Sequence, residues 1–266
     1  MLLRELDYAR PESVEEAVKL LSGRDDARAL AGGQSLVNVM KTRVASPELV
    51  VDLGRVQTLA GIRQVDGALE IGAMTTYSAI VYSADVAAAR PILAQVARTI
   101  ADVQVRNRGT IGGNVCSNDP TNHFPPLVAA LGAELTIAGP DGQRTVSAED
   151  FFEGVYLTAV QPGELLTSVR FPSKGDARDG WASVTLGKEG TGIVNVAATV
   201  TGGTARIAIG CVAATPVVVT ASADETAIRD AVRSAGLDPP ADVHASADYR
   251  RHLAEVLAAR AVREAA

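Results

Sequence analysis

Two glycine-rich segments hold the residues of this sequence that are best suited to bind a ligand. The first is Ala31-Gly32-Gly33-Gln34-Ser35, which lies between a short apolar run and a predicted helix, Leu36 to Lys41. Glycines let backbone N–H groups approach a phosphate closely, and the start of a helix favours an anion. Gln34 and Ser35 add side-chain donors. The alternative is an ordinary tight turn, and the segment matches neither a Walker loop nor a GxGxxG motif.

The second segment is Thr110-Ile111-Gly112-Gly113-Asn114, with Arg106 and Arg108 just before it. A glycine pair beside a hydroxyl and an amide suits a phosphate or a flexible ribityl chain. The alternative is a loop that packs on a neighbouring strand. Two such loops, far apart in one chain, predict a long ligand with a diphosphate in its middle.

The remaining reactive residue types give weaker signals. Cys116 is interpreted as a small buried hydrophobic residue. His123 lies in a proline-marked loop from Asn118 to Pro126, where a hydrogen-bonded scaffold role is favoured over catalysis. His244 and His252 are expected at the surface. Neither metal-ligand spacing nor a nucleophile elbow is found, so the sequence predicts no catalytic residue and no metal site.

The first half of the chain must position both glycine segments. It begins as strand, helix, strand, with a capping box at Ser13 and Glu16 and a buried strand at 49–53. A hairpin is predicted from Ile62 to Ala73 around Asp66-Gly67. Further elements are a helix that starts at Pro91, a strand at 135–138, and a strand at 165–171 that ends before Pro172.

A polar segment, Ser173 to Gly180, is interpreted as the main domain boundary. Beyond it, 193–200 and 205–212 are predicted to form a hairpin. Two helical segments follow, at 224–235 and 246–264. In the second of these segments, Tyr249, Leu253, Val256 and Leu257 are expected to share one buried face. The arginines of this segment are expected to face water. The sequence therefore predicts an α+β protein, with mixed sheets first and then a small sheet backed by helices.

Composition narrows the functional classes. The chain has 266 residues, 47% of them hydrophobic, and a net charge of −6, which fits one large or two small domains and argues against nucleic-acid binding. No apolar run of about 18 residues predicts a membrane span, and the N-terminus lacks an apolar signal core. The chain has two cysteines, too few for a disulfide framework, which suits a cytoplasmic protein. They also cannot ligate an iron–sulfur cluster by themselves, because such a cluster normally takes about four thiolates.

Several of these motifs are similar to one known family. The segments 31–36, 40–43 and 49–53, the later 106–114, and the ending Ser246-Ala247-Asp248-Tyr249-Arg250-Arg251-His252-Leu253 resemble the FAD-binding medium subunit of the molybdenum hydroxylases. Aerobic carbon monoxide dehydrogenase and xanthine dehydrogenase are of this type. The resemblance covers nearly the whole chain and has three separated motifs in the same order.

The resemblance implies a two-part FAD-binding domain of the vanillyl-alcohol-oxidase type at residues 1–172, with subdomains at about 1–56 and 57–172. A small C-terminal α+β flavoprotein domain, a three-stranded sheet with helices, would occupy residues 178–266. The implied FAD-binding residues fall in the two glycine loops and at six further positions. They are Ala31, Gly32, Gly33, Gln34, Ser35, Leu36, Ile100, Thr110, Gly112, Gly113, Asn114, His123, Leu165, Leu166 and Lys188. An aspartate commonly stands at the His123 position in carbon monoxide dehydrogenase-like members.

By the same resemblance, the chain is the flavin subunit of a multi-subunit oxidoreductase. Molybdopterin is expected on a large partner subunit and [2Fe–2S] clusters on a small one, in a cytoplasmic dimer of heterotrimers. Electrons would pass from the clusters through FAD to NAD+, a quinone or oxygen. A free-standing FAD-dependent oxidoreductase on the same scaffold is the alternative, and a descendant that keeps the fold without binding FAD is a third hypothesis.

Overall fold

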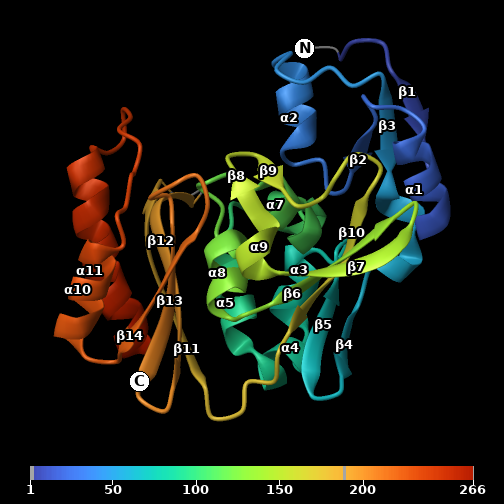
Figure 1. The fold of residues 1–266 in the computed structure, drawn as a ribbon. Coiled ribbons are helices and arrows are strands. Elements are labelled where there is room, and N and C mark those ends of the chain that lie inside the picture. The colour runs from blue at the N-terminus through green and yellow to red at the C-terminus, as the bar shows by residue number, and fades with distance from the viewer. Residues whose placement is uncertain (1–2, 188–189, 266) are drawn as a thin grey trace.

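The N-terminal part of the chain forms a small parallel sheet. The computed structural model describes residues 3–187 and 190–265 (Figure 1). Within these residues, the three strands of the N-terminal sheet lie in the order β1–β3–β2, and both outer strands run parallel to β3. Its elements, including two 3₁₀ turns, are β1 (Asp7–Ala9), α1 (Val14–Ser22), β2 (Arg28–Leu30), α2 (Leu36–Lys41), β3 (Leu49–Asp52), η1 (Leu53–Arg55) and η2 (Gln57–Leu59). Ser13 caps α1 by accepting a hydrogen bond from the Glu16 amide, as predicted.

The second sheet is antiparallel and has β10 at its centre, in the order β4–β5–β10–β6–β7. Its strands are β4 (Ile62–Val65), β5 (Ala68–Gly72), β6 (Glu134–Gly139), β7 (Gly142–Ser147) and β10 (Leu165–Phe171). Asp66 and Gly67 both have positive φ, 51° and 77°, which the predicted two-residue hairpin turn requires.

Helices from the long connection between β5 and β6 cover this sheet on the side that faces the C-terminal part of the chain (Figure 1). They are α3 (Tyr77–Tyr82), α4 (Ala84–Ala89), α5 (Pro91–Thr99), α6 (Val103–Arg108), α7 (Ile111–Ser117) and α8 (Phe124–Ala130). A short helix and a two-stranded hairpin precede β10: α9 (Ala148–Phe151), β8 (Phe152–Gly154) and β9 (Leu157–Thr158).

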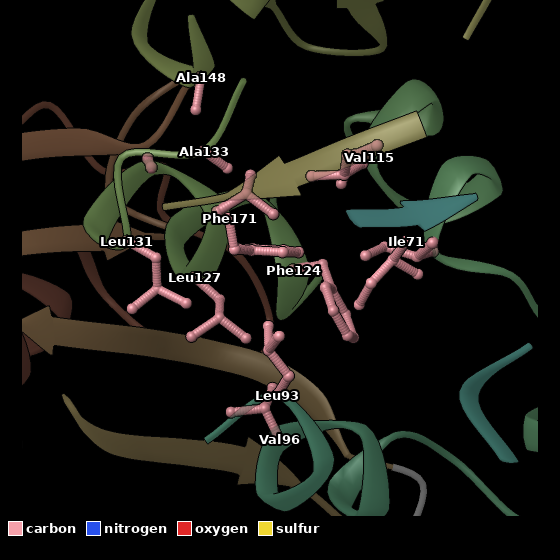
Figure 2. Close-up of a cluster of buried hydrophobic side chains, with 14 of the residues drawn as sticks. Ile71, Leu93, Val96, Val115, Phe124, Leu127, Leu131, Ala133, Ala148 and Phe171 are labelled. Atoms are coloured by element: carbon pink, nitrogen blue, oxygen red, sulfur yellow. The ribbon is translucent and has the colours of Figure 1, made fainter. Parts of the chain in front are cut away.

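The largest core lies between this sheet and the helices. Phe124 and Leu127 of α8 pack with Leu93 of α5, Ile71 of β5 and Phe171 of β10 (Figure 2). All seven residues of α8 are buried, because the helix is covered on both sides. A helix that is apolar all round is typical of such a central position.

A second antiparallel sheet, β11–β12–β13–β14, makes up most of the C-terminal part of the chain. The elements of this C-terminal part are the strands β11 (Arg178–Leu186), β12 (Thr191–Thr201), β13 (Thr204–Gly210) and β14 (Val217–Ser222) and the helices α10 (Glu225–Ser234) and α11 (Ala247–Glu264). One face carries α10 and α11 (Figure 1). The other face contributes Trp181, Ala197 and Ala208 to the core around α8. The α+β class predicted from the sequence is confirmed.

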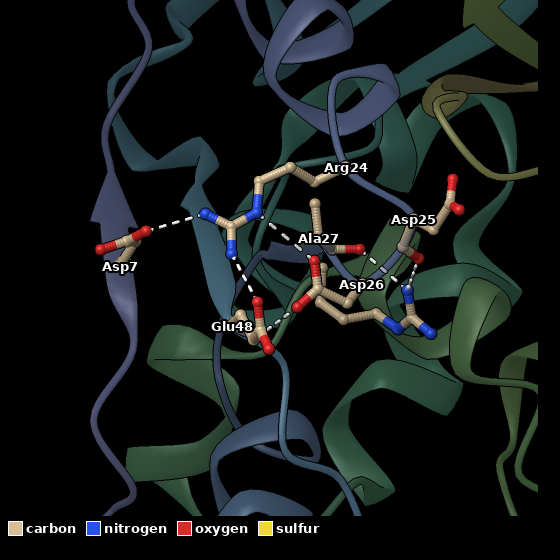
Figure 3. Close-up of polar contacts among 7 residues, drawn as sticks. Asp7, Arg24, Asp25, Asp26, Ala27 and Glu48 are labelled. Atoms are coloured by element: carbon tan, nitrogen blue, oxygen red, sulfur yellow. Dashed lines mark hydrogen bonds and ion pairs between the residues drawn. The ribbon is translucent and has the colours of Figure 1, made fainter.

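Surface ion pairs tie the N-terminal sheet together. The Arg24 guanidinium lies 2.8 Å from a carboxylate oxygen of Asp7, 2.9 Å from one of Glu48 and 3.5 Å from one of Asp26 (Figure 3). These residues come from β1, the start of β3 and the turn before β2. Because the pairs are exposed to solvent, they contribute little to stability.

Three details differ from the sequence-based expectations. In the described part of the chain the C-terminal sheet has four strands, where three were expected, since β14 adds an edge strand to the predicted hairpin. The segment Thr110–Asn114 is the start of a helix rather than a loop. The arginines of α11 do not all face water: the side chain of Arg250 is 4% exposed and donates to the Ile193 carbonyl and to Asp242, whereas Tyr249 is 47% exposed.

Candidate functional site

The first glycine loop connects β2 to α2 and presents unused backbone donors. Gly33 has a φ of +73°, a conformation that favours glycine. Among residues 3–187 and 190–265, no acceptor pairs with the N–H groups of Gly33, Gln34 and Ser35. The Ser35 hydroxyl makes no capping hydrogen bond to α2 either. Adjacent backbone N–H groups without protein acceptors are suited to bind an anion such as a phosphate.

The second glycine loop is arranged differently, because its amides are used within the protein. The Ile111 N–H donates to the Thr75 carbonyl at 3.0 Å, and the Gly112 N–H donates to the Ala73 carbonyl at 2.9 Å. The Gly113 N–H donates to the Thr110 hydroxyl, which caps α7. A Cβ on Gly112 would lie 2.6 Å from the Cβ of Ala73, so this glycine allows close packing. This loop therefore has few free donors to offer a phosphate.

The two glycine loops touch each other. A Cβ on Gly32 would lie 2.1 Å from the carbonyl oxygen of Arg108, so only glycine lets the first loop rest on the backbone just before the second. A Cβ on Gly113 would lie 3.6 Å from that of Ala31. The free amides of the first loop and the side chains of the second therefore belong to one continuous site.

Asn114 supplies an acceptor to this site. Its side chain is 9% exposed, and in the described structure its Oδ1 atom has no hydrogen-bond partner. A carbonyl oxygen cannot pair with a deprotonated phosphate, but it accepts a hydrogen bond from a hydroxyl group. The site thus combines donors for an anion with a buried acceptor for a hydroxyl. FAD has both groups, in its diphosphate and its ribityl chain, so the residues present fit this cofactor.

The other predicted FAD contacts lie on several elements, and their contact with FAD stays a prediction. Ile100 follows the last residue of α5 and is partly buried, with its carbonyl accepting from Arg106. Leu165 and Leu166 are adjacent on β10 and lie in two different apolar clusters, one toward the N-terminal sheet and one in the main core. Leu36 is the first residue of α2. Lys188 lies outside the described residues.

Comparisons with known proteins identify the family. A model of the FAD binding domain in molybdopterin dehydrogenase matches residues 4–174, and a model of the CO dehydrogenase flavoprotein C-terminal domain matches residues 182–265. The chain belongs to the FAD-binding subunits of the molybdenum hydroxylases. It is 41% identical to the carbon monoxide dehydrogenase medium chain of Afipia carboxidovorans, over 100% of this chain and 98% of the relative. It is 34% identical to the nicotine 6-hydroxylase medium subunit of Paenarthrobacter nicotinovorans, over 100% and 99%.

Solved structures agree with this family assignment. A Cu,Mo-CO dehydrogenase chain superimposes with a TM-score of 0.93 at 40% identity, covering 100% of this chain and 99% of that one. A chain of quinoline 2-oxidoreductase from Pseudomonas putida 86 gives a TM-score of 0.90 at 34% identity, covering 100% and 98%. FAD is thus the cofactor of this chain, and the relatives are subunits of multi-subunit oxidoreductases.

His123, one of the predicted FAD contacts, is buried against the C-terminal sheet. Its side chain is 4% exposed and stacks on Trp181 of β11, with ring centroids 5.5 Å apart. Burial lowers the pKa of His123 to about 4, although a hydrogen bond to the Thr121 backbone opposes the shift, so the ring is neutral at pH 7. Its Nε2 atom has no partner within the described structure. His123 therefore links the flavin domain to the C-terminal sheet, and its contact with FAD stays a prediction.

No further reactive centre stands out in this flavin subunit. Burial raises the pKa of the Cys116 and Cys211 thiols to about 12, so both stay protonated and are poor nucleophiles. Within the described ranges, no three His, Cys, Asp or Glu residues gather as a metal site. In the same ranges, every helix is too short or too polar to cross a membrane.

Sequence reasoning missed three buried residues. Trp181 beside His123 was not singled out, and neither were Tyr77 beside Gly109 or Arg90, which pairs with Asp179. None lies in a recognisable motif. Their buried partners come from distant parts of the chain, so a local pattern could not reveal them.

Proposed function

We propose that this chain is the electron-transfer flavin subunit of a molybdenum hydroxylase-type dehydrogenase. FAD bound here supplies the redox chemistry, taking electrons from [2Fe–2S] clusters on a small partner subunit and giving them to NAD+, a quinone or oxygen. The substrate is oxidised on a large molybdopterin-binding subunit, and the whole is a dimer of heterotrimers. The names of the relatives support this proposal, since they are medium chains of multi-subunit enzymes. The two free cysteines, Cys116 and Cys211, support a cytoplasmic location.

The chain's own residues hold the cofactor. The free amides of Gly33, Gln34 and Ser35 bind the diphosphate, and Oδ1 of Asn114 accepts from a ribityl hydroxyl. The contact between Gly32 and the Arg108 backbone carries this assignment, because it joins the donor loop to the acceptor. Residues 1–172 make up the FAD-binding domain, in two parts at about 1–56 and 57–172, and residues 178–266 make up the C-terminal flavoprotein domain.

The flavin site is tested with Gly33→Asp. The new carboxylate lies among the amides that bind the diphosphate and repels it, so we expect the purified variant to retain no FAD. Gly67→Asp is the matched control, because Gly67 has a similar φ of +77° but lies in the β4–β5 turn with no atom within 4 Å of its Cβ position. Flavin absorbance per chain is the measurement. Full occupancy in Gly33→Asp would overturn the diphosphate assignment.

The partner assignment needs a separate experiment. Affinity-tagged chain, expressed in its native host, is purified and the proteins bound to it are identified by mass spectrometry. We expect a small chain with paired C-x-x-C motifs and a large chain in equal amounts. A flavin-loaded monomer or homodimer that oxidises a substrate alone would instead establish the free-standing oxidoreductase.

A further inference from the structure

Asn195 is a polar residue in the middle of β12, on the face of the C-terminal sheet that contacts the flavin domain. Ala197, two residues further along the strand, belongs to the core around α8, whereas the neighbouring Val196 packs in the core beneath α10 and α11. Asn195 is 0% exposed. A fully buried amide must find its hydrogen-bond partners inside the protein.

The backbone around Asn195 leaves room for this side chain. The register of β11 on β12 shifts between Val184 and Thr185, which marks a β-bulge beside Asn195. A Cβ on Gly192 would lie 2.3 Å from Nδ2 of Asn195, so only glycine fits there without displacing the amide. The bulge and the glycine together give the Asn195 side chain a defined place.

Asn195 binds the loop that precedes α8. Its Nδ2 atom donates to two consecutive backbone carbonyls, that of Thr121 at 3.2 Å and that of Asn122 at 3.4 Å. Because both partners are acceptors, the nitrogen end of the amide must face the loop. The next residue, His123, stacks on Trp181 of β11. The C-terminal sheet therefore holds this loop at three successive residues.

The same loop is tied to α7, the helix that begins with the second glycine loop. The side-chain Nδ2 of Asn122 donates to the Asn114 carbonyl and to the Ser117 hydroxyl, both at 3.0 Å. Asn114 also carries the buried Oδ1 atom that has no partner in the described part of the chain. Two hydrogen-bonded steps thus connect β12 to the acceptor of the flavin site.

We propose that Asn195 is a positioning residue for FAD: it fixes the loop before α8, and through Asn122 this loop fixes α7 and the Asn114 acceptor. The proposal rests on the proposed function, since it requires FAD in this site. It gives the C-terminal sheet a part in binding the ribityl chain. The diphosphate, held by the first glycine loop, lies outside this path.

A double-mutant cycle tests this path on the flavin-free chain, with FAD affinity measured by quenching of flavin fluorescence. Asn195→Ala removes both hydrogen bonds to the loop, and we expect it to raise the Kd about fivefold, the effect of losing one hydrogen bond. Asn122→Ala breaks the link from the loop to α7 and should raise the Kd by a similar factor. In the Asn122→Ala background, Asn195→Ala should change the Kd less than about twofold, because the path is already broken.

Two controls separate positioning from a general loss of stability. Val196→Ala is the matched variant, because Val196 is also 0% exposed but lies on the helix side of the sheet, and its FAD Kd should equal that of the wild type. ADP has the diphosphate but no ribityl chain, so it should compete for the site with the same affinity in the wild type and in Asn195→Ala.

Several results would overturn the inference. They are an unchanged FAD Kd in Asn195→Ala, an equal loss in Val196→Ala, additive losses in the double variant, or an equal loss of ADP affinity. An Asn195→Ala chain without the circular dichroism of the folded wild type would also overturn it, since Asn195 would then serve stability alone. Failure of the wild-type chain to bind FAD would instead overturn the proposed function.

Discussion

Replacing Arg90 with methionine should strongly destabilise the chain, because Arg90 joins the flavin domain to the C-terminal sheet. Its guanidinium donates to both carboxylate oxygens of Asp179 on β11, at 2.7 and 2.9 Å. It also donates to the Pro172 carbonyl in the connection between the two parts, at 3.2 Å. One side chain thus holds both ends of the interdomain connection.

The size of the effect follows from the burial of this pair. The two side chains are only 4% and 3% exposed. Without Arg90, the Asp179 carboxylate keeps one hydrogen bond, from the Thr199 hydroxyl at 2.9 Å. Removing one partner of a buried ion pair costs about 3–5 kcal/mol, because a charge is left buried without compensation. That is a large share of a total stability of about 5–15 kcal/mol.

Urea unfolding of the flavin-free chain, followed by circular dichroism, measures this loss. Arg170→Met is the matched control, since Arg170 pairs with Glu134 at 3.1 Å but both are exposed, and it should cost about 1 kcal/mol or less. The double variant Arg90→Met/Asp179→Leu should be more stable than Arg90→Met, because no charge is left behind. A loss in Arg90→Met no greater than in Arg170→Met would refute the reasoning.

Three more results are expected. Gly32→Ala should reduce flavin content per chain, because its Cβ would lie 2.1 Å from the Arg108 carbonyl oxygen; absorbance measures this, and full occupancy would argue against the close contact. The pKa of His123 is lowered from 6.5 to about 4, so its stabilisation is present above pH 6.5 and is lost as the pH falls toward 4. The free energy of unfolding should be measured at pH 6.5 and at pH 4. Protonation of His123 should lower it by about 3 kcal/mol in the wild type, and this contribution should be absent in His123→Gln. Burial raises the pKa of Cys211, which is 3% exposed, so a thiol reagent at neutral pH should label it only after denaturation; rapid labelling of Cys211 in the native chain would contradict its burial.

Elements with strong local signals were predicted well from the sequence. Proline at the first position of α5 and the Asp66-Gly67 turn are examples, because each fixes the backbone through its own residue types. Pro172 ends β10 at Phe171, as predicted. The first glycine loop was also found, because glycines between a strand and a helix have a local meaning.

The second glycine loop was misread, because tertiary contacts decide its structure. Each glycine inside a helix costs about 1 kcal/mol, so Gly112 and Gly113 argue against helix α7 on propensity alone. The helix forms because Thr110 caps it and because Gly112 lets it pack directly on Ala73. The sequence contains the cap but gives no indication that Ala73 is nearby.

The buried face of α11 was predicted in part. Leu253 and Leu257 are buried as expected, but Tyr249 is exposed, and the buried side also includes alanines such as Ala254, Ala258 and Ala261. Small side chains allow the helix to lie close to the sheet, which brings Arg250 into the interior beside Ile193 and Asp242. A pattern of large hydrophobic residues leaves these alanines out, so it included Tyr249 in the buried face and missed Arg250.

The central place of β10 in its sheet has a consequence for synthesis of the chain. This strand is the last of its sheet to leave the ribosome, yet it pairs with β5 on one side and β6 on the other. Until residue 171 has emerged, both partner strands carry an unpaired edge, and such edges favour aggregation. The nascent chain therefore cannot complete this sheet until β10 has emerged, and the order of synthesis leaves the inner edges of β5 and β6 unpaired during translation.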